Sequence, residues 1–245
     1  MPYFRNDDLS LHYVEMGSGA PLILLHGFGM SARSCWIDTG VAERLASAGH
    51  RLFVLDARGH GDSDKPTDPA AYDADRMMGD VLALMDQAGL EQAGFVGHSM
   101  GGRTVLNILS EQGGRGRASV VVSNGGNVFQ SPQTAAMAEA FATGETAHLP
   151  GPLAGFVTML MDLGNDGAAL AAYCRNPRPA LTKDYLAAIA APVRVVCGDE
   201  DPIVGDPGLL RDALPGGDLV MVAGCEHTDL LASPVFQSAA LEWLG

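Results

Sequence analysis

The sequence predicts an α/β protein with a mostly parallel β-sheet that is covered by helices on both faces. Short, unbroken aliphatic runs alternate with longer stretches whose apolar residues have helical spacing. Strands buried on both faces of a parallel sheet have continuous apolar runs, because every side chain meets a covering helix. A chain of 245 residues, 47% of them hydrophobic, is long enough to build such a core.

Strands are expected at the short apolar runs, which are residues 9–15, 21–25, 51–55, 93–96, 118–123, 193–197 and 219–222. The first run alternates apolar and polar residues and is therefore expected to be half-exposed. Helices are expected at residues 34–48, 72–88, 102–110 and 233–244. Because crossovers between parallel strands are right-handed, the strand ends lie along one edge of the sheet, and so does any site built on them.

The segment of residues 127–190 interrupts this alternation. It has no strand-like run, is rich in Ala, Met, Phe and Leu, and is broken by prolines. A plain crossover needs far fewer residues, so we expect a small helical cap over the carboxyl edge of the sheet. The core then comprises residues 1–126 and 191–245. The alternative is a pair of ordinary crossover helices with long loops.

One pentapeptide, Gly97-His98-Ser99-Met100-Gly101, stands between a predicted strand and a predicted helix. It fits the pattern G-x-S-x-G, which needs that strand–turn–helix context. The turn is so tight that small residues flank the serine, and the serine is held in a strained conformation with its Oγ exposed. Ser99 is therefore the predicted nucleophile.

A serine hydroxyl needs a base within hydrogen-bond reach. Among seven histidines, His227 is the predicted base, because it follows the last strand and so lies at the same edge as Ser99. The base needs an acid that holds its tautomer and stabilises its cation. Asp201, just after another strand, is the predicted acid. Asp199 and Glu200 are expected to be solvated loop charges.

Two backbone N–H groups are predicted to stabilise charge on the substrate oxygen. That of Met100 lies at the first turn of the helix after Ser99, where the helix dipole adds to its effect. The second is that of Phe28, in the loop His26-Gly27-Phe28-Gly29 that ends a strand. The glycines of this loop allow its backbone to approach the site, and the Phe28 side chain is expected to line the pocket.

Together these motifs resemble the α/β-hydrolase fold family over essentially the whole chain. The signatures are His26-Gly27-Phe28-Gly29, Asp-Ala-Arg-Gly-His-Gly-Asp-Ser at 56–63, Gly-His-Ser-Met-Gly-Gly at 97–102, Gly-Asp-Glu-Asp at 198–201, and His227. The resemblance implies an eight-stranded, mostly parallel sheet, a cap inserted after the sixth strand, and no cofactor. It also implies that residues 56–63 form a structural loop near the site.

The resemblance favours a serine hydrolase that cleaves carboxylic esters through an acyl-enzyme on Ser99. Epoxide hydrolases and haloalkane dehalogenases of this fold place Asp at the nucleophile position, so a serine there argues for acyl chemistry. The short cap, rich in Met and Phe, suggests small to medium apolar acyl or alcohol groups. Phe28, Phe156 and Met159 are the predicted contacts, and Met-rich walls adapt to several shapes.

Three alternatives stay open. The same triad serves carbon–carbon bond hydrolysis of vinylogous diketones. It also serves the menaquinone-pathway lyase of this fold, in which the arginine of a similar Ser-x-Gly-Gly-Arg segment helps to hold a carboxylated substrate. The matching residue is Arg103, a candidate substrate contact that is otherwise a helix-surface or structural ion-pair residue. A non-catalytic ligand receptor with the same fold is the third alternative, which multiple turnover would exclude.

The formal net charge of −14 disfavours nucleic acid and anionic membranes as partners. We expect no signal peptide and no transmembrane segment. The four cysteines match no metal or redox pattern and are expected to be free thiols. The prediction is thus a cytoplasmic enzyme without a metal, acting on a small-molecule ester, whose oligomeric state the sequence leaves open.

Overall fold

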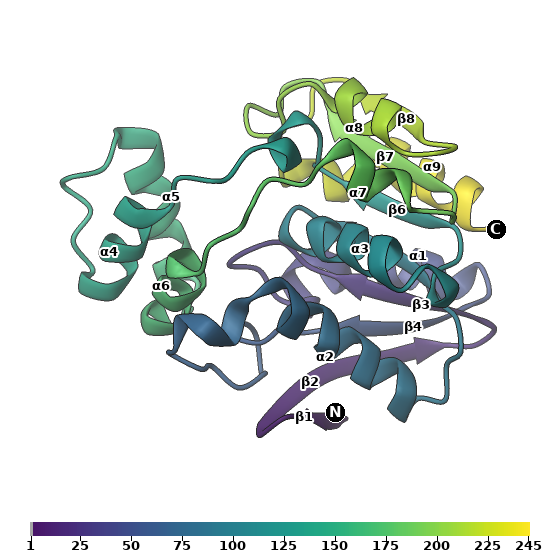
Figure 1. Ribbon diagram of the computed structural model, residues 1–245, viewed down its shortest axis with the longest axis horizontal. Helices are drawn as coiled ribbons and strands as arrows, with labels where there is room; N and C mark the ends of the chain where they lie inside the picture. Colours follow the sequence, from purple (N-terminus) through teal and green to yellow (C-terminus); the bar gives the residue numbers. More distant parts are fainter. Residues whose placement is uncertain (1) are drawn as a thin grey trace.

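The computed structural model describes residues 2–245. Its centre is an eight-stranded sheet with the order β1-β2-β4-β3-β5-β6-β7-β8 (Figure 1). The strands are β1 (Tyr3–Asn6), β2 (Leu9–Gly17), β3 (Ala20–Leu25), β4 (His50–Leu55), β5 (Gly94–His98), β6 (Ser119–Val122), β7 (Val193–Gly198) and β8 (Asp218–Val222). β2 is antiparallel to both β1 and β4, and all other neighbours are parallel. The predicted fold class is confirmed.

Successive residues of the central strands pack into two different cores. In β4, Phe53 and Leu55 enter one core, whereas Leu52 and Val54 enter the other. Side chains alternate between the faces of a strand, so a sheet covered on both faces requires the unbroken aliphatic runs seen in the sequence. Both faces of the sheet are accordingly covered by helices (Figure 1).

The first core is completed by α2 (Ala74–Gln87), α3 (Met100–Glu111), α7 (Lys183–Ala187) and α8 (Pro207–Ala213). The second is completed by α1 (Val41–Ser47) and α9 (Pro234–Leu244). Shorter helical turns are η1 (Arg33–Ile37), η2 (Pro69–Tyr72), η3 (Gly113–Arg115), η4 (Gly126–Phe129) and η5 (Asp229–Ala232). Across residues 2–245, no helix has both the length and the apolar character needed to cross a membrane.

Three further helices form a separate lobe beside the sheet, which we call the cap (Figure 1). They are α4 (Ala135–Thr143), α5 (Gly151–Asp162) and α6 (Gly167–Arg175). Their buried side chains share a third core with Tyr72 and Met100. The cap is also tied to the loop after β3, where Asn165 Nδ2 donates to the Gly29 carbonyl at 2.9 Å. The cap therefore rests against the edge of the sheet where β3 and β5 end.

The segment 127–190, predicted as cap, is divided between the two layers. Helix α7 packs against α3 and α8, and Leu186 and Ile189 are buried in the first core of the sheet. Composition does not separate the two parts, because an Ala- and Leu-rich helix suits either layer. We propose that the chain divides into a core and a cap, and that the cap helices lie within Ala135–Arg175.

Three other elements differ from the prediction. β1 was not expected, because Phe4 is its only buried residue and pairing with β2 creates the strand. Residues 34–48 form not one helix but η1 and α1, which are separated at Gly40, where φ is 79°. Helix α8 was also not expected, although Asp206 caps it by accepting from Gly208 N at 2.8 Å and Pro207 follows at its first position.

Candidate active site

The carboxyl ends of β5, β6, β7 and β8 lie side by side at one edge of the sheet. Ser99 follows β5, Asp201 follows β7 and His227 follows β8. Ser99 Oγ lies 2.9 Å from His227 Nε2, and His227 Nδ1 lies 2.7 Å from Asp201 Oδ2. The three residues predicted as nucleophile, base and acid therefore form one hydrogen-bonded line.

The turn at Ser99 depends on glycines two residues before and two residues after the serine. Ser99 has φ 50° and ψ −105°, a strained conformation for a residue with a Cβ. A Cβ on Gly97 would lie 2.6 Å from the Gly101 carbonyl oxygen, and one on Gly101 would lie 2.1 Å from that of Leu25. The Ser99 N–H donates to Val122 O at 2.9 Å, which fixes the turn to β6. The structure thus has the tight strand–turn–helix geometry that the sequence predicts.

Asp201 has a fully buried side chain and accepts from Ile203 N at 2.9 Å as well as facing His227. Burial raises the pKa of Asp201, but the hydrogen bond from His227 and the backbone N–H groups of Ile203 and Val204 outweigh it and hold this pKa below its usual 3.8. Asp201 is therefore a carboxylate at neutral pH.

The two acidic residues before Asp201 have different surroundings. Asp199 Oδ1 accepts from Gly224 N at 2.7 Å and so joins the loops after β7 and β8. Glu200 is exposed. Within residues 2–245, neither carboxylate forms a hydrogen bond or ion pair with His227. Of the three acidic residues in this loop, Asp201 is the one that contacts the imidazole.

The backbone of His227 is held by two residues that the sequence analysis did not single out for this purpose. Its carbonyl accepts from His98 Nε2 at 2.9 Å and from Ser123 Oγ at 3.0 Å. Burial, and then the neighbouring His227, lowers the pKa of His98 to about 3, so its ring is neutral. Because a carbonyl only accepts, the proton of that ring lies on Nε2. Ser123 has φ 53°, a conformation that no sequence pattern reveals.

The two predicted donors to a substrate oxygen have no partner in the described chain. Among residues 2–245, no backbone or side-chain oxygen accepts from the N–H of Phe28 or of Met100. Their neighbours are fixed, since Gly101 N donates to His26 O at 3.1 Å and Met30 N donates to Gly27 O at 3.1 Å. Gly27 also lies directly against the His98 ring, which brings its loop next to the turn at Ser99. Neither N–H is thus used within the described part of the chain, and their role as oxyanion donors stays a prediction.

Known proteins are similar to this chain in family and in fold. The model of the alpha/beta hydrolase fold family matches residues 20–155, more than half of the chain. The chain belongs to the alpha/beta hydrolase fold family. Bifunctional epoxide hydrolase 2 of Mus musculus is 37% identical to this chain over 101 residues, which cover 41% of the chain and 18% of that protein. The match thus spans less than one fifth of this relative.

Two solved structures are similar over nearly their whole length. The enol-lactonase from Burkholderia xenovorans LB400 superposes on this chain with a TM-score of 0.82 and 22% identity, over 99% of both chains. Est816, described as an N-acyl homoserine lactone degrading enzyme, has a TM-score of 0.76 and 25% identity, over 97% of the present chain and 98% of its own. At 22% identity, the similarity to the enol-lactonase shows a shared fold.

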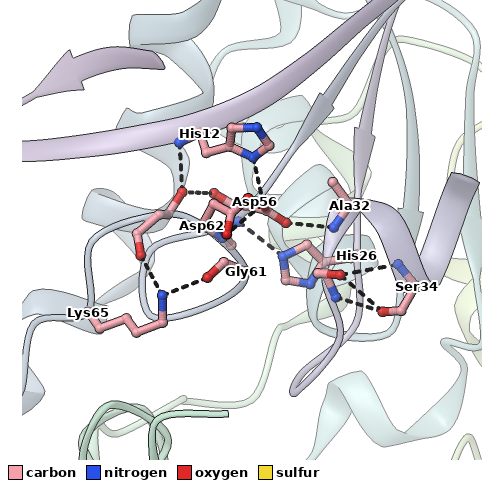
Figure 2. Close-up of polar contacts among 11 residues, drawn as sticks. His12, His26, Ala32, Ser34, Asp56, Gly61, Asp62 and Lys65 are labelled. Atoms are coloured by element: carbon pink, nitrogen blue, oxygen red, sulfur yellow. Dashed lines mark hydrogen bonds and ion pairs between the residues drawn. The ribbon is translucent and has the colours of Figure 1, made fainter. Parts of the chain in front are cut away.

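The signature loop at residues 56–63 is held by buried polar contacts (Figure 2). Asp56 accepts from His12 Nδ1 at 2.7 Å, from Ala32 N at 2.6 Å and from Asp62 N at 3.1 Å. Arg58 forms a buried ion pair with Asp80 at 2.6 Å. The ligand-type atoms of His12, Asp56 and Asp62 lie within 4.8 Å of one another, but these hydrogen bonds account for the grouping without an ion.

A cavity of about 470 Å³ lies between α2, α3 and the segment 177–182. Of the predicted substrate contacts, Arg103 lines it, whereas Phe28, Phe156 and Met159 do not. Val157 and Leu160 take the buried face of α5, so Met159 turns outward and is 48% exposed. Phe156 packs partly buried against the third core. The structure therefore does not bring the two cap residues to the cavity.

Proposed function

We propose that this hydrolase cleaves carboxylic esters of small molecules through an acyl-enzyme on Ser99. The observation that carries the proposal is the line from Ser99 Oγ through both nitrogens of His227 to the buried Asp201. His227 Nε2 takes the hydroxyl proton while Oγ attacks the ester carbonyl carbon. Asp201 accepts a hydrogen bond from the Nδ1–H of His227, which holds the tautomer and stabilises the imidazolium.

The unpartnered N–H groups of Phe28 and Met100 supply the donors that the tetrahedral oxyanion needs. The imidazolium of His227 returns its proton to the leaving alcohol, and the acyl group stays on Ser99. His227 then takes a proton from a water molecule that attacks the acyl carbonyl. The tetrahedral adduct then collapses, His227 gives this proton to Ser99 Oγ, and the carboxylic acid is released with the Ser99 hydroxyl restored.

The chemistry of the relatives supports esters over epoxides. A carboxylate nucleophile opens an epoxide to an ester, which water cleaves at its carbonyl. A serine hydroxyl would open an epoxide to an ether, which has no carbonyl for water to attack. Ser99 therefore argues against the reaction named for the mouse relative. The names of the enol-lactonase and of Est816 describe lactones, which are cyclic esters and suit the same mechanism.

The test is steady-state hydrolysis of p-nitrophenyl esters from acetate to dodecanoate by the wild type and by Ser99→Ala. We expect multiple turnovers by the wild type and a loss in the variant of roughly 10³-fold or more, with an unchanged melting temperature. Ester turnover that survives in Ser99→Ala would overturn the proposal. Labelling of Ser99 by a fluorophosphonate without turnover of any ester would favour the carbon–carbon hydrolase or the lyase that uses Arg103.

A further inference from the structure

The cavity between α2, α3 and residues 177–182 reaches the residue that follows the predicted nucleophile. That residue is Met100, whose N–H is a proposed oxyanion donor and which lines the cavity. Arg103 lies one helical turn further along α3, and its N–H donates to the Ser99 carbonyl at 3.0 Å. Tyr173 and Arg178, from the end of α6 and the chain after it, also line the cavity. Two guanidinium groups thus line a cavity whose wall includes the first turn of α3.

Neither guanidinium is paired with a carboxylate. Among residues 2–245, no Asp or Glu oxygen lies within 4.0 Å of the side-chain nitrogens of Arg103 or Arg178. In contrast, the buried Arg58 is neutralised by Asp80 at 2.6 Å. Arginines that line a cavity without an acidic partner keep their charge available for an anionic ligand.

Both side chains are nevertheless held in place by neutral groups. Arg103 donates to the carbonyls of Val128, at 3.4 Å, and Pro179. Arg178 donates to the carbonyl of Tyr173 at 2.6 Å and to the hydroxyl of Thr134 at 3.1 Å. A guanidinium has five N–H donors, so each keeps donors for a ligand after these bonds are made. The positions are fixed in advance, which lowers the entropy cost of binding.

An aromatic stack connects this cavity to the loop of the proposed oxyanion donor. The Arg178 guanidinium lies 4.4 Å from the centre of the Tyr173 ring, and that ring stacks on Phe28 with centroids 4.9 Å apart. Burial lowers the pKa of Arg103, Tyr173 opposes this, and the charge of Arg178 lowers it further. The two cations therefore repel each other, and a bound anion would relieve the repulsion.

The cavity is also lined by three acidic residues, Asp73, Asp75 and Glu111. Asp73 and Asp75 are at the start of α2, where Asp73 caps the helix and pairs with Arg76. Glu111 is the last residue of α3, about 12 Å along the helix from Arg103, and accepts from Tyr185 OH at 2.9 Å. Asp73 and Glu111 therefore have partners of their own and do not neutralise the two guanidinium groups.

We propose that Arg103 and Arg178 bind a carboxylate carried by the substrate, so that the substrate class is the monoesters of dicarboxylic acids. This inference rests on the proposed ester hydrolysis at Ser99. The ester carbonyl lies at Ser99 and the free carboxylate of the acyl chain lies between the two guanidinium groups. The cap composition predicted apolar substrate groups. The two arginines favour instead an acyl chain that ends in a carboxylate.

The test compares monoethyl esters of dicarboxylic acids, from succinate to suberate, with ethyl esters of monocarboxylic acids of the same chain length. Acid release in a pH-stat measures both series. We expect kcat/KM to favour the acidic ester by about tenfold or more. Arg103→Gln and Arg178→Gln should each reduce this ratio by roughly 10- to 100-fold, the range for hydrogen bonds to charged groups. The preference should also fall as salt concentration rises.

Arg175→Gln is the matched control, because Arg175 lies three residues before Arg178 but is exposed and pairs with Glu139 at 3.9 Å. It should leave the ratio unchanged. Neutral esters hydrolysed as well as acidic ones, or a ratio unaffected by the two variants, would overturn the subsite and leave the ester hydrolase standing.

Binding separates the subsite from the proposed function. Calorimetry with Ser99→Ala and monoethyl adipate requires no turnover. Binding by Ser99→Ala that is lost in Ser99→Ala/Arg178→Gln supports the carboxylate subsite even if no ester is hydrolysed. Absence of binding by Ser99→Ala, at concentrations up to several millimolar, contradicts it.

Discussion

At the scale of single residues, strain gathers around His227. Within residues 2–245, the non-glycine residues with positive φ are Asp7, Ser99 and Ser123. Ser99 faces the imidazole of His227 and Ser123 donates to its carbonyl. Such conformations cost about 1–3 kcal/mol each and persist where the surrounding structure fixes them. Two of the three strained residues therefore position the side chain and the backbone of one histidine.

Asp201→Asn should lower kcat by about 10⁴-fold, the effect of the equivalent change in the serine-protease template. An amide would present an N–H to His227 Nδ1 and so select the wrong tautomer. Steady-state kinetics with p-nitrophenyl butyrate measure the effect.

Asp199→Asn is the control for this change, because Asp199 lies two residues away and bonds Gly224 N instead of His227. Its kcat should change by less than about threefold. If Asp199→Asn caused the larger loss, Asp199 would be the acid and the assignment of Asp201 would be wrong.

The sequence predicted the three residues of the line because each lies in the segment that follows a strand, and parallel strands end at one edge. It did not predict the contacts that hold His227 in place. Whether His98 donates to a backbone carbonyl depends on the loop after β8, which meets it only in the folded chain. Local motifs therefore identify reactive groups better than the groups that position them.

At the scale of elements, the start of α3 limits which residues follow the nucleophile. Gly101→Ala would place a Cβ 2.1 Å from the backbone oxygen of Leu25, and a backbone atom in β3 cannot turn aside as a side chain can. We expect a loss of stability of about 2–4 kcal/mol, measured by urea unfolding.

Gly155→Ala is a matched comparison, since Gly155 lies within α5 and an added Cβ there meets no atom within 4 Å. Alanine should stabilise this helix by about 0.5–1 kcal/mol. A Gly101→Ala protein as stable as the wild type would show that β3 and α3 can separate and that the turn is less constrained than it looks.

The elements show why prediction succeeded for the strands and less well for the cap. Strands β3, β4 and β6 are apolar on both faces. Short unbroken aliphatic runs of this kind indicate buried parallel strands. The helices of segment 127–190 are apolar wherever they pack, so their sequences do not say whether α7 covers the sheet or joins the cap. Met159 illustrates the same problem, because an apolar residue in a cap helix faces either the core or the solvent.

At the scale of the whole molecule, buried neutral histidines couple stability to pH. Burial lowers the pKa of His26, His60 and His98, the latter two to about 3. In the unfolded chain these rings gain protons below about pH 6.5, whereas in the folded protein His60 and His98 gain them only near pH 3. For these two rings the unfolded state therefore binds more protons between about pH 3 and 6.5, and stability falls as the pH is lowered through that range. The lowered pKa of His26 acts in the same direction.

The free energy of unfolding should accordingly decrease from pH 7.5 to pH 5, by up to about 1.4 kcal/mol per pH unit for each such histidine below pH 6.5. Urea unfolding at fixed ionic strength measures it. His148→Gln removes an exposed histidine and should leave the slope unchanged. Stability that is constant over this range would mean that the buried rings take up protons without unfolding.

The line from Ser99 to His227 spans 128 residues of sequence, with the whole cap between its ends. Contacts so distant along the chain close large loops, and these loops form late in folding because their entropy cost must be met first. Helices of the cap and of α3 need only local contacts. During refolding from urea, helical circular dichroism should therefore recover before ester turnover does. The return of catalytic activity then measures when the loop that carries His227 reaches Ser99.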